Sequence, residues 1–304
     1  MTKLKKLTAV ILTKNEAKNL PRCLKSLAFA GTILVIDDGS IDQTVEIAEK
    51  AGARVFKRRL DDFSSQRNFA LTKVKTSWVL MVDADEEVTP SLASEISQAI
   101  KKKNYSGFAF RRKNLIFGSW VKHSGWYPDW QLHLFKTKKG CYQGRVHERN
   151  RVKGKTGQLQ AHLIHHNYES ISHFLHSDQF DQYASLEAEQ LAKNGYGFFW
   201  PDLIKKPVDE FLRRFFAEKG YLDGLIGLIL AVLQAFKEFV IYAKVWERSP
   251  SQPELPPEEF LGNLSQEFSR KQREIDFWLF GARAKTGKNF FKKLFLTLQR
   301  KISQ

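Results

Sequence analysis

The segment from Trp78 to Glu87, which reads WVLMVDADEE, constrains the fold of this chain more than any other. It begins as a short, apolar, partly β-branched run typical of a buried strand and ends in Asp83 and Asp85. Such a strand delivers paired carboxylates to the carboxyl edge of a sheet, where open α/β sheets bind ligands. Mg2+ and Mn2+ prefer these oxygens, usually one or two carboxylates together with substrate phosphates. The alternative is a solvated turn before an acidic helix.

Two earlier segments repeat this pattern of an apolar strand that ends in polar side chains. Residues 7–12 lead into Thr13–Glu16, and residues 32–36 lead into Asp37 and Asp38. Helical patterns follow both, so residues 1–90 predict a β-α-β-α-β order. Right-handed crossovers bring the ends of such parallel strands to one edge of a sheet. The predicted fold class is therefore α/β, with a mostly parallel central sheet.

Taken together, these motifs resemble family 2 glycosyltransferases of the Rossmann-like A-type fold. The matching residues are Asn15-Glu16, the run VIDDGS at residues 35–40, and Asp83-Ala84-Asp85. Three further matches are similar to the lipopolysaccharide-core β-1,4-glucosyltransferase-like group: DFSSQRN at 62–68, WYPDWQLHLF at 126–135 and VHE at 146–148. The resemblance covers residues 5–175 well and the remainder loosely.

This resemblance implies a UDP-sugar donor and a divalent cation, Mg2+ or Mn2+. It implies that Asp85 binds the metal, that Asp83 binds the metal or the ribose, and that Asp38 reads the uracil or ribose. Arg67 could contact the diphosphate, because its planar guanidinium suits phosphate. The residues expected around the donor are Thr13, Asn15, Glu16, Asp38, Gln66, Arg67, Asp83 and Ala84.

Glycosyl transfer also needs a general base that takes the proton of the acceptor hydroxyl. Residues 101–160 hold fifteen Lys and Arg but only two acids, Asp129 and Glu148. The placement of Asp129 is similar to the base-bearing acidic motif of inverting family members, so we favour it, and Glu148 is the rival. Nearby cations are expected to keep either carboxylate ionised at neutral pH.

The net charge of +16 comes mostly from this same stretch. It suits an acidic partner, and we expect a sugar-nucleotide diphosphate and an anionic membrane rather than nucleic acid. All eight histidines fall between His123 and His176, and two cysteines are too few for a disulfide scaffold. The histidine spacing fits no familiar zinc pattern, although His165 or His166 could be a third ligand beside Asp85.

Residues 201–304 differ in composition from the rest. We expect a catalytic domain over 1–200, with a nucleotide-sugar half (1–110) and an acceptor half (111–200), and a helical, membrane-associating region with amphipathic helices over 201–304. Residues 222–246 have one broad apolar face at helical spacing, but their uninterrupted apolar run is too short to span a bilayer. Such a helix lies in the membrane interface, packs on the protein or forms a dimer. Residues 283–301 predict a basic amphipathic helix that would bind anionic lipid.

The sequence thus predicts an inverting, metal-dependent enzyme that moves a hexose, with glucose as the first candidate, from a UDP-sugar to a membrane glycolipid or lipopolysaccharide-core acceptor. We expect it on the cytoplasmic face of the membrane, peripheral or monotopic, because residues 1–6 enter the first strand without the apolar core of a signal peptide. One alternative is a polyprenyl-phosphate glycosyltransferase of the same fold. Another is a non-catalytic basic protein that binds anionic membrane or nucleic acid.

Overall fold

The computed structural model describes residues 3–144, 149–176, 178–249, 256–286 and 299. The described residues fall into two compact units, one made of residues up to 120 with 127–171, the other of residues 121–126 with those from 172 onward. This division comes earlier than the predicted boundary at residue 200. The reason is that helix α6 (Asp178–Lys193) packs Ala184 and Ala188 against Ile241 and Val245 of helix α8 (Leu225–Glu247).

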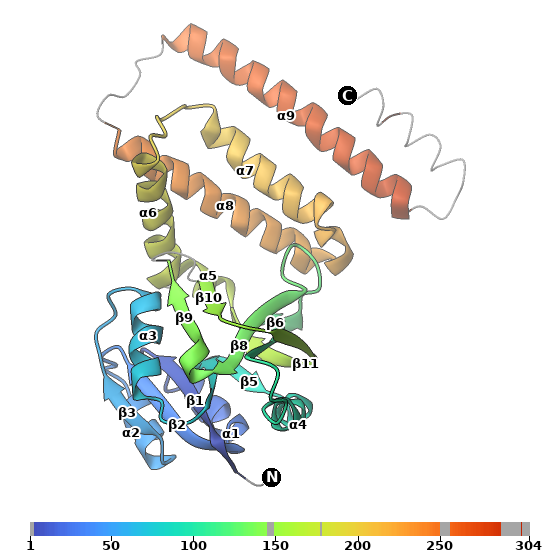
Figure 1. Ribbon diagram of the computed structural model, residues 1–304. Coiled ribbons are helices and arrows are strands. Elements are labelled where there is room, and N and C mark those ends of the chain that lie inside the picture. The colour runs from blue at the N-terminus through green and yellow to red at the C-terminus, as the bar shows by residue number, and fades with distance from the viewer. Residues whose placement is uncertain (1–2, 145–148, 177, 250–255, 287–298, 300–304) are drawn as a thin grey trace. The chain divides into compact units, whose positions relative to one another are not determined.

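A nine-stranded sheet forms the centre of the first unit (Figure 1). Its order is β3-β2-β1-β4-β8-β6-β11-β5, with β7 beside β6. One half is parallel and contains β1 (Leu4–Thr13), β2 (Ala30–Asp37), β3 (Arg54–Lys57) and β4 (Trp78–Asp83). The other half is mixed and contains β5 (Glu86–Val88), β6 (Gly107–Ile116), β7 (Ser119–Trp120), β8 (Asp129–Lys136) and β11 (Thr156–His166). The α/β prediction is confirmed: the first half of the sheet is parallel throughout, and in the second half β6 and β11 pair parallel while the other pairs are antiparallel.

Helices cover both faces of the parallel strands, which explains their unbroken apolar sequences. Along β4, Trp78, Leu80 and Val82 join one core cluster, whereas Val79 and Met81 join a second one on the opposite face. The first cluster includes side chains of α1 (Leu20–Ser26), α2 (Thr44–Lys50) and α4 (Pro90–Ala99). The second includes side chains of α3 (Phe63–Lys73). The period-two alternation therefore fixes which face each residue packs against.

The register of the parallel strands places three strand ends level at one edge. Leu12 of β1 pairs with Ile36 of β2 on one side and with Asp83 of β4 on the other, and Thr13 pairs with Asp37. This is the arrangement predicted from the repeated polar strand ends.

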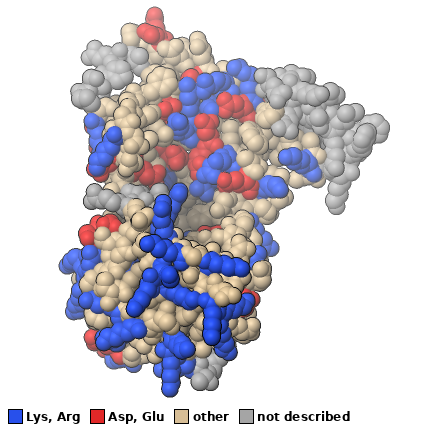
Figure 2. Space-filling view, viewed as in Figure 1, with Lys and Arg blue, Asp and Glu red and all other residues tan. Residues whose placement is uncertain are grey.

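A short helix η1 (Thr137–Lys139) leads to a separate hairpin of β9 (Gly140–Gln143) and β10 (Arg149–Val152). On β10 the exposed Arg149 and Arg151 alternate with the half-buried Asn150 and Val152. Figure 2 shows Lys and Arg side chains gathered over the visible face of the first unit. Of the basic residues in 101–160, several are exposed and others are half-buried, so this stretch faces solvent only in part: Lys101, Lys102, Lys138, Lys139 and Lys153 are exposed, and Arg111, Arg112 and Lys113 are half-buried.

The second unit is helical, and α8 is its most apolar element. Among the described residues, α8 is the one helix long and apolar enough to cross a membrane by length and composition, and only 28% of its most apolar window is buried. The predicted helix over 222–246 is therefore present, whereas the predicted basic helix over 283–301 falls largely outside the described residues. The other helices are α5 (Ile171–His176), α7 (Asp202–Leu212), the π-helical η2 (Arg213–Ala217), η3 (Gly220–Asp223) and α9 (Pro257–Thr286).

Candidate active site

The loops that follow β1 and β2 are joined by hydrogen bonds at the carboxyl edge of the sheet. Asn15 adopts a positive φ of 55°, and its backbone N–H donates to Ser40 Oγ over 2.9 Å. Its side-chain Oδ1 accepts from the backbone N–H of Ile41 at 2.9 Å, and the N–H of Glu16 donates to Thr44 Oγ1 at 2.7 Å. The motifs Asn15-Glu16 and Asp37-Asp38-Gly39-Ser40 therefore form one structure, as their common edge requires.

Two buried aspartates anchor the loop after β2. Asp37 accepts a hydrogen bond from Thr13 Oγ1 at 3.3 Å, so that both side chains brace the strand ends. Asp38 receives the backbone N–H of Leu60 at 2.7 Å and lies 3.4 Å from Lys14 Nζ. The predicted donor residues Thr13 and Asp38 are thus held in place by the fold.

The strand-end carboxylates lie close enough to Glu16 to affect its pKa. Burial raises the pKa of Glu16 to about 7, and the carboxylates of Asp85, Asp42 and Asp83 act in the same direction. Asn19 opposes this shift by donating to Glu16 Oε2 at 3.0 Å. The acidic edge therefore favours the presence of a cation or a proton.

Helix α3 brings Arg67 against one of the two aspartates predicted to bind metal. Asp62 caps the helix by accepting from the backbone N–H of Ser65, and Arg67 Nη2 lies 2.9 Å from Asp83 Oδ1. Burial alone would raise the pKa of Asp83, but Arg67, together with His133 and Arg112, outweighs burial and holds that pKa well below its usual range. Gln66 of the same helix is buried and hydrogen-bonded to Arg58, where it braces the preceding loop.

Asp85 contacts an imidazole rather than a guanidinium. His165 Nε2 lies 3.1 Å from Asp85 Oδ2, and His165 Nδ1 lies 2.7 Å from Asn114 Oδ1. Because an amide oxygen can only accept, Nδ1 must carry the proton in this pair, which leaves Nε2 directed at Asp85. Burial lowers the pKa of His165, but the Asp85 carboxylate outweighs it and raises that pKa overall.

Asp129 sits opposite Arg112 in the register of β8 and β6. Arg112 Nε donates to Asp129 Oδ2 at 2.6 Å, and Gln131 Nε2 and Asn114 Nδ2 also donate to this carboxylate. Burial alone would raise the pKa of Asp129, but Arg112 and these hydrogen bonds lower it. Asp129 is therefore ionised at neutral pH, as predicted.

Arg112 also reaches the Asp-x-Asp turn through Glu86, which is fully buried. Arg112 Nη1 lies 3.4 Å from Glu86 Oε1, and Glu86 Oε2 accepts the backbone N–H of Asp83 at 2.8 Å. A connected set of contacts, here called the carboxylate ring, thus links the strand end with the predicted base. It consists of Asp83, Asp85, Glu86, Arg112, Asn114, Asp129 and His165.

The donor atoms of this ring fit a divalent cation shared with a substrate. No group of three or more His, Cys, Asp and Glu suited to holding a metal occurs among the described residues. A cation that also binds phosphates and water needs only one or two protein carboxylates, however. The side chains of Asp83 and Asp85 are 31% and 27% exposed, so both can meet an incoming anion and its metal. His165 Nε2 lies beside the Asp85 carboxylate.

The remaining predictions have separate outcomes. The Ala84 side chain is buried in the core, which leaves only its backbone to face a donor. Glu148 lies outside the described residues, so its role as the rival base stays a prediction.

Sequence reasoning missed Arg112, Asn114 and Glu86. A period-two extension of the strand after Phe110 would have placed the first two on its buried face.

Known proteins provide an independent comparison. The family description Glycosyl transferase family 2 matches residues 8–161, about half of the chain. An uncharacterized glycosyltransferase, RT0209 of Rickettsia typhi, is 27% identical over 81% of this chain and 88% of its own length. The lipopolysaccharide core biosynthesis glycosyltransferase LpsC of Rhizobium meliloti is 26% identical over 80% of this chain and 92% of its own.

Solved structures give a more distant likeness. S. aureus TarS 1-349, in complex with UDP-GlcNAc, is 16% identical, with a TM-score of 0.43 over 79% of this chain and 84% of its own. The family match over half of the chain carries the assignment instead. This chain belongs to glycosyl transferase family 2 and is a glycosyltransferase.

Proposed function

We propose that this enzyme transfers a hexose from a UDP-sugar to a membrane glycolipid, with Mg2+ or Mn2+ and with inversion at the anomeric carbon. The single observation that carries the proposal is the carboxylate ring. It connects Asp83 and Asp85, which suit a metal diphosphate, with Asp129, which suits the acceptor. One site therefore contains the groups for both halves of the reaction.

On the donor side, Asp85 would hold the cation together with Asp83 and His165. The cation supplies charge neutralisation for the departing diphosphate. Arg67 keeps Asp83 ionised and offers a second positive group beside the same strand end. Asn15, Glu16 and Asp38 would bind the nucleoside, because their loops are joined at this edge.

On the acceptor side, Asp129 would accept the proton of the attacking hydroxyl. The hydroxyl oxygen bonds to the anomeric carbon while the bond from that carbon to the diphosphate oxygen breaks, and UDP leaves. Because Arg112 lowers the pKa of Asp129, this carboxylate is always ionised but is a weak base. Proton transfer then becomes favourable only as the hydroxyl gains positive charge in the transition state.

The nature of the acceptor is supported by the relative LpsC, whose name places it in lipopolysaccharide core biosynthesis. A lipid-linked acceptor and a cytosolic donor would meet at the cytoplasmic face of the cell membrane. We therefore place the enzyme there, with glucose as the first donor sugar to examine.

The decisive experiment compares Asp85→Asn with Glu46→Gln, an exposed carboxylate on α2 that pairs only with Lys50 among the described residues. Calorimetry would measure UDP binding with and without Mn2+, and a donor screen would measure UDP release and transfer. We expect Asp85→Asn to lose Mn2+-dependent UDP binding and at least about a thousandfold in transfer. Glu46→Gln should behave as the wild type. Mn2+-dependent UDP binding that survives in Asp85→Asn would contradict the metal assignment.

A further inference from the structure

Helix α8 exposes large apolar side chains along one side and packs the other. The exposed residues, here called the α8 stripe, are 37% to 71% exposed and follow one another at spacings of three, four or seven: Leu225, Leu228, Val232, Phe236, Phe239 and Trp246. These spacings place them on one side of the helix. The buried residues lie on the opposite side: Gly227, Leu230, Ala231, Ile241, Tyr242 and Val245.

Apart from the last residue of α8, the exposed Glu247, the charged side chains of this helix avoid the stripe. Lys237 Nζ lies 3.0 Å from Glu187 Oε1 and Lys244 Nζ lies 2.8 Å from Asp181 Oδ1, both on α6. Between Leu225 and Trp246 the only other charged residue is Glu238, which follows Lys237 and is half-buried. A helix that faces water shows the reverse pattern, with its polar residues outward. The exposed side of α8 therefore suits an apolar environment.

We propose that the α8 stripe lies in the interface of a phospholipid membrane and anchors the protein to its surface. The proposal rests on the proposed function only in placing the acceptor in that same membrane. A helix in this position buries its apolar face about 5–10 Å into the boundary between headgroups and acyl chains. Contiguous exposed apolar side chains on a protein mark a contact with a membrane or with another protein.

A position along the membrane surface fits the packing better than a position across it. The 23 residues of α8 are long enough to cross, since a spanning helix needs about 20. Crossing would carry Lys237, Glu238 and Lys244 into hydrocarbon and break the ion pairs with α6. It would also expose the side of α8 that packs against α6 and α7. Lying flat keeps these contacts and buries only the stripe.

Lipid suits the stripe better than a protein partner. Protein interfaces carry about one hydrogen bond per 100–200 Å2 and a polar rim. The stripe offers a single hydrogen-bonding group, the indole of Trp246 at its end, and Trp is favoured at membrane interfaces. Lys219 and Leu222, both exposed, lie just before the start of α8. The Lys219 ammonium can contact anionic headgroups there.

The test is flotation of the full-length protein with vesicles of phosphatidylethanolamine and phosphatidylglycerol. The stripe variant combines Leu228→Gln, Val232→Gln and Phe239→Gln, and leaves Phe236 in place because its ring stacks on Phe180 of α6. The matched control combines Leu261→Gln, Phe268→Gln and Leu279→Gln, three similarly exposed apolar residues of α9. We expect the vesicle-bound fraction to fall at least about tenfold in the stripe variant and less than about twofold in the control. Carbonate should release the wild type from the vesicles.

Three results would overturn the proposal. Vesicle binding by the stripe variant could equal that of the wild type or of the control. Carbonate could fail to release the wild type, which would indicate a spanning helix. A wild-type dimer could become a monomer in the stripe variant with vesicle binding unchanged, which would make the stripe a contact between copies. Circular dichroism and UDP calorimetry of each variant report its folding. Flotation needs neither donor nor acceptor, so its outcome is separate from that of the proposed function.

Discussion

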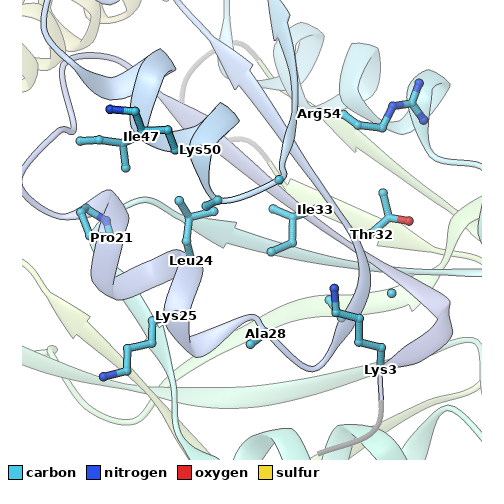
Figure 3. A pocket seen from close by; sticks show the side chains of 14 residues that line it. Lys3, Pro21, Leu24, Lys25, Ala28, Thr32, Ile33, Ile47, Lys50 and Arg54 are labelled. Atoms are coloured by element: carbon cyan, nitrogen blue, oxygen red, sulfur yellow. The ribbon is translucent and has the colours of Figure 1, made fainter.

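The two edges of the sheet in the first unit differ in the groups they carry: one has converging ionisable side chains, and the other has a cavity with an apolar floor. The carboxyl edge carries the carboxylate ring, whose members converge from five strands and one turn. The amino edge carries a cavity of about 750 Å3 between the starts of β1 and β2 and the ends of α1 and α2. Figure 3 shows its apolar floor of Pro21, Leu24 and Ile33, with Lys3, Lys25, Lys50 and Arg54 around it.

The two edges differ in the ionisable groups that converge on them. No carboxylate lines the amino-edge cavity. Two of its cations have structural partners, since Lys50 pairs with Glu46 and the guanidinium of Arg54 lies 5.6 Å from the centre of the Phe56 ring. Lys25 and Lys50 also end helices α1 and α2, where the helix dipole favours a cation. The charges at this edge therefore stabilise the fold without a ligand.

The largest effect should follow from removing the proposed base at the carboxyl edge. Asp129→Asn keeps the size of the side chain but cannot accept the proton, so we expect kcat to fall by about 10²–10⁴. UDP affinity in the presence of Mn2+ should stay within about twofold, because Asp129 does not contact the donor loops. Steady-state kinetics and calorimetry measure the two quantities. If Glu148→Gln shows the larger loss in kcat and Asp129→Asn a small one, Glu148 is the base.

A smaller effect should come from Asn114, which touches both His165 and Asp129. Asn114→Leu removes the acceptor that fixes the His165 tautomer, and such second contacts to a metal ligand contribute about 10–100-fold in metal affinity. We expect Mn2+ affinity, measured by calorimetry with UDP present, to fall by that amount, and Asn114→Asp to restore most of it. Asn68→Leu is the matched control, since Asn68 bonds only to the backbone of Tyr142 among the described residues. Equal losses in both leucine variants would show that Asn114 is merely structural.

The sequence predicted the parts of this edge that depend on local pattern. Asp37 and Asp83 each end an apolar run, and the rule that parallel strands share an edge was enough to bring them together. The sequence did not predict Glu86, Arg112 and Asn114, because their contacts depend on the pairing of β6 with β8 and β11. Those strands are distant in sequence, and their register comes from tertiary packing. The alternative of a non-catalytic basic protein is wrong, because the chain is a family 2 glycosyltransferase.

The helix over 222–246 shows another limit of sequence reasoning. Its apolar residues predicted a helix with a broad apolar face, but the spacing alone could not say which part of that face meets other helices. Contacts with α6 settle this, since they place Lys237 and Lys244 on the packed side and leave the stripe exposed.

Burial of ionisable groups at the carboxyl edge should also make stability depend on pH. His133 of β8 is 7% exposed, and its burial, with Arg67 nearby, lowers its pKa to about 3. Below the unfolded pKa of about 6.5 the unfolded chain takes up this proton and the folded one does not. His133 therefore contributes stability that is present above about pH 6.5 and is lost as the pH falls towards 3.

We expect this loss to reach about 2 kcal/mol between pH 7 and pH 5, because each pH unit below the unfolded pKa costs about 1.4 kcal/mol. His133→Gln removes the titrating group, so the free energy of unfolding should fall less over this range than in the wild type. Urea unfolding at both pH values measures the difference between the two proteins. Parallel pH dependence in wild type and variant would show that folding does not lower the pKa of His133.

The smallest effect should come from the amino edge, where the combined change Lys25→Gln and Arg54→Gln removes two cations from the cavity. If Lys25 interacts only with the end of α1 and Arg54 only with the Phe56 ring, the free energy of unfolding should fall by about 1 kcal/mol or less. UDP affinity and transfer should then stay within about twofold of the wild type, because neither residue reaches the carboxyl edge. Thermal unfolding and transfer to a glycolipid acceptor measure these quantities. A variant that keeps UDP binding but loses transfer would show that the cavity contributes to acceptor binding. Both edges would then take part in the reaction, the carboxyl edge at the donor and the amino edge at the acceptor.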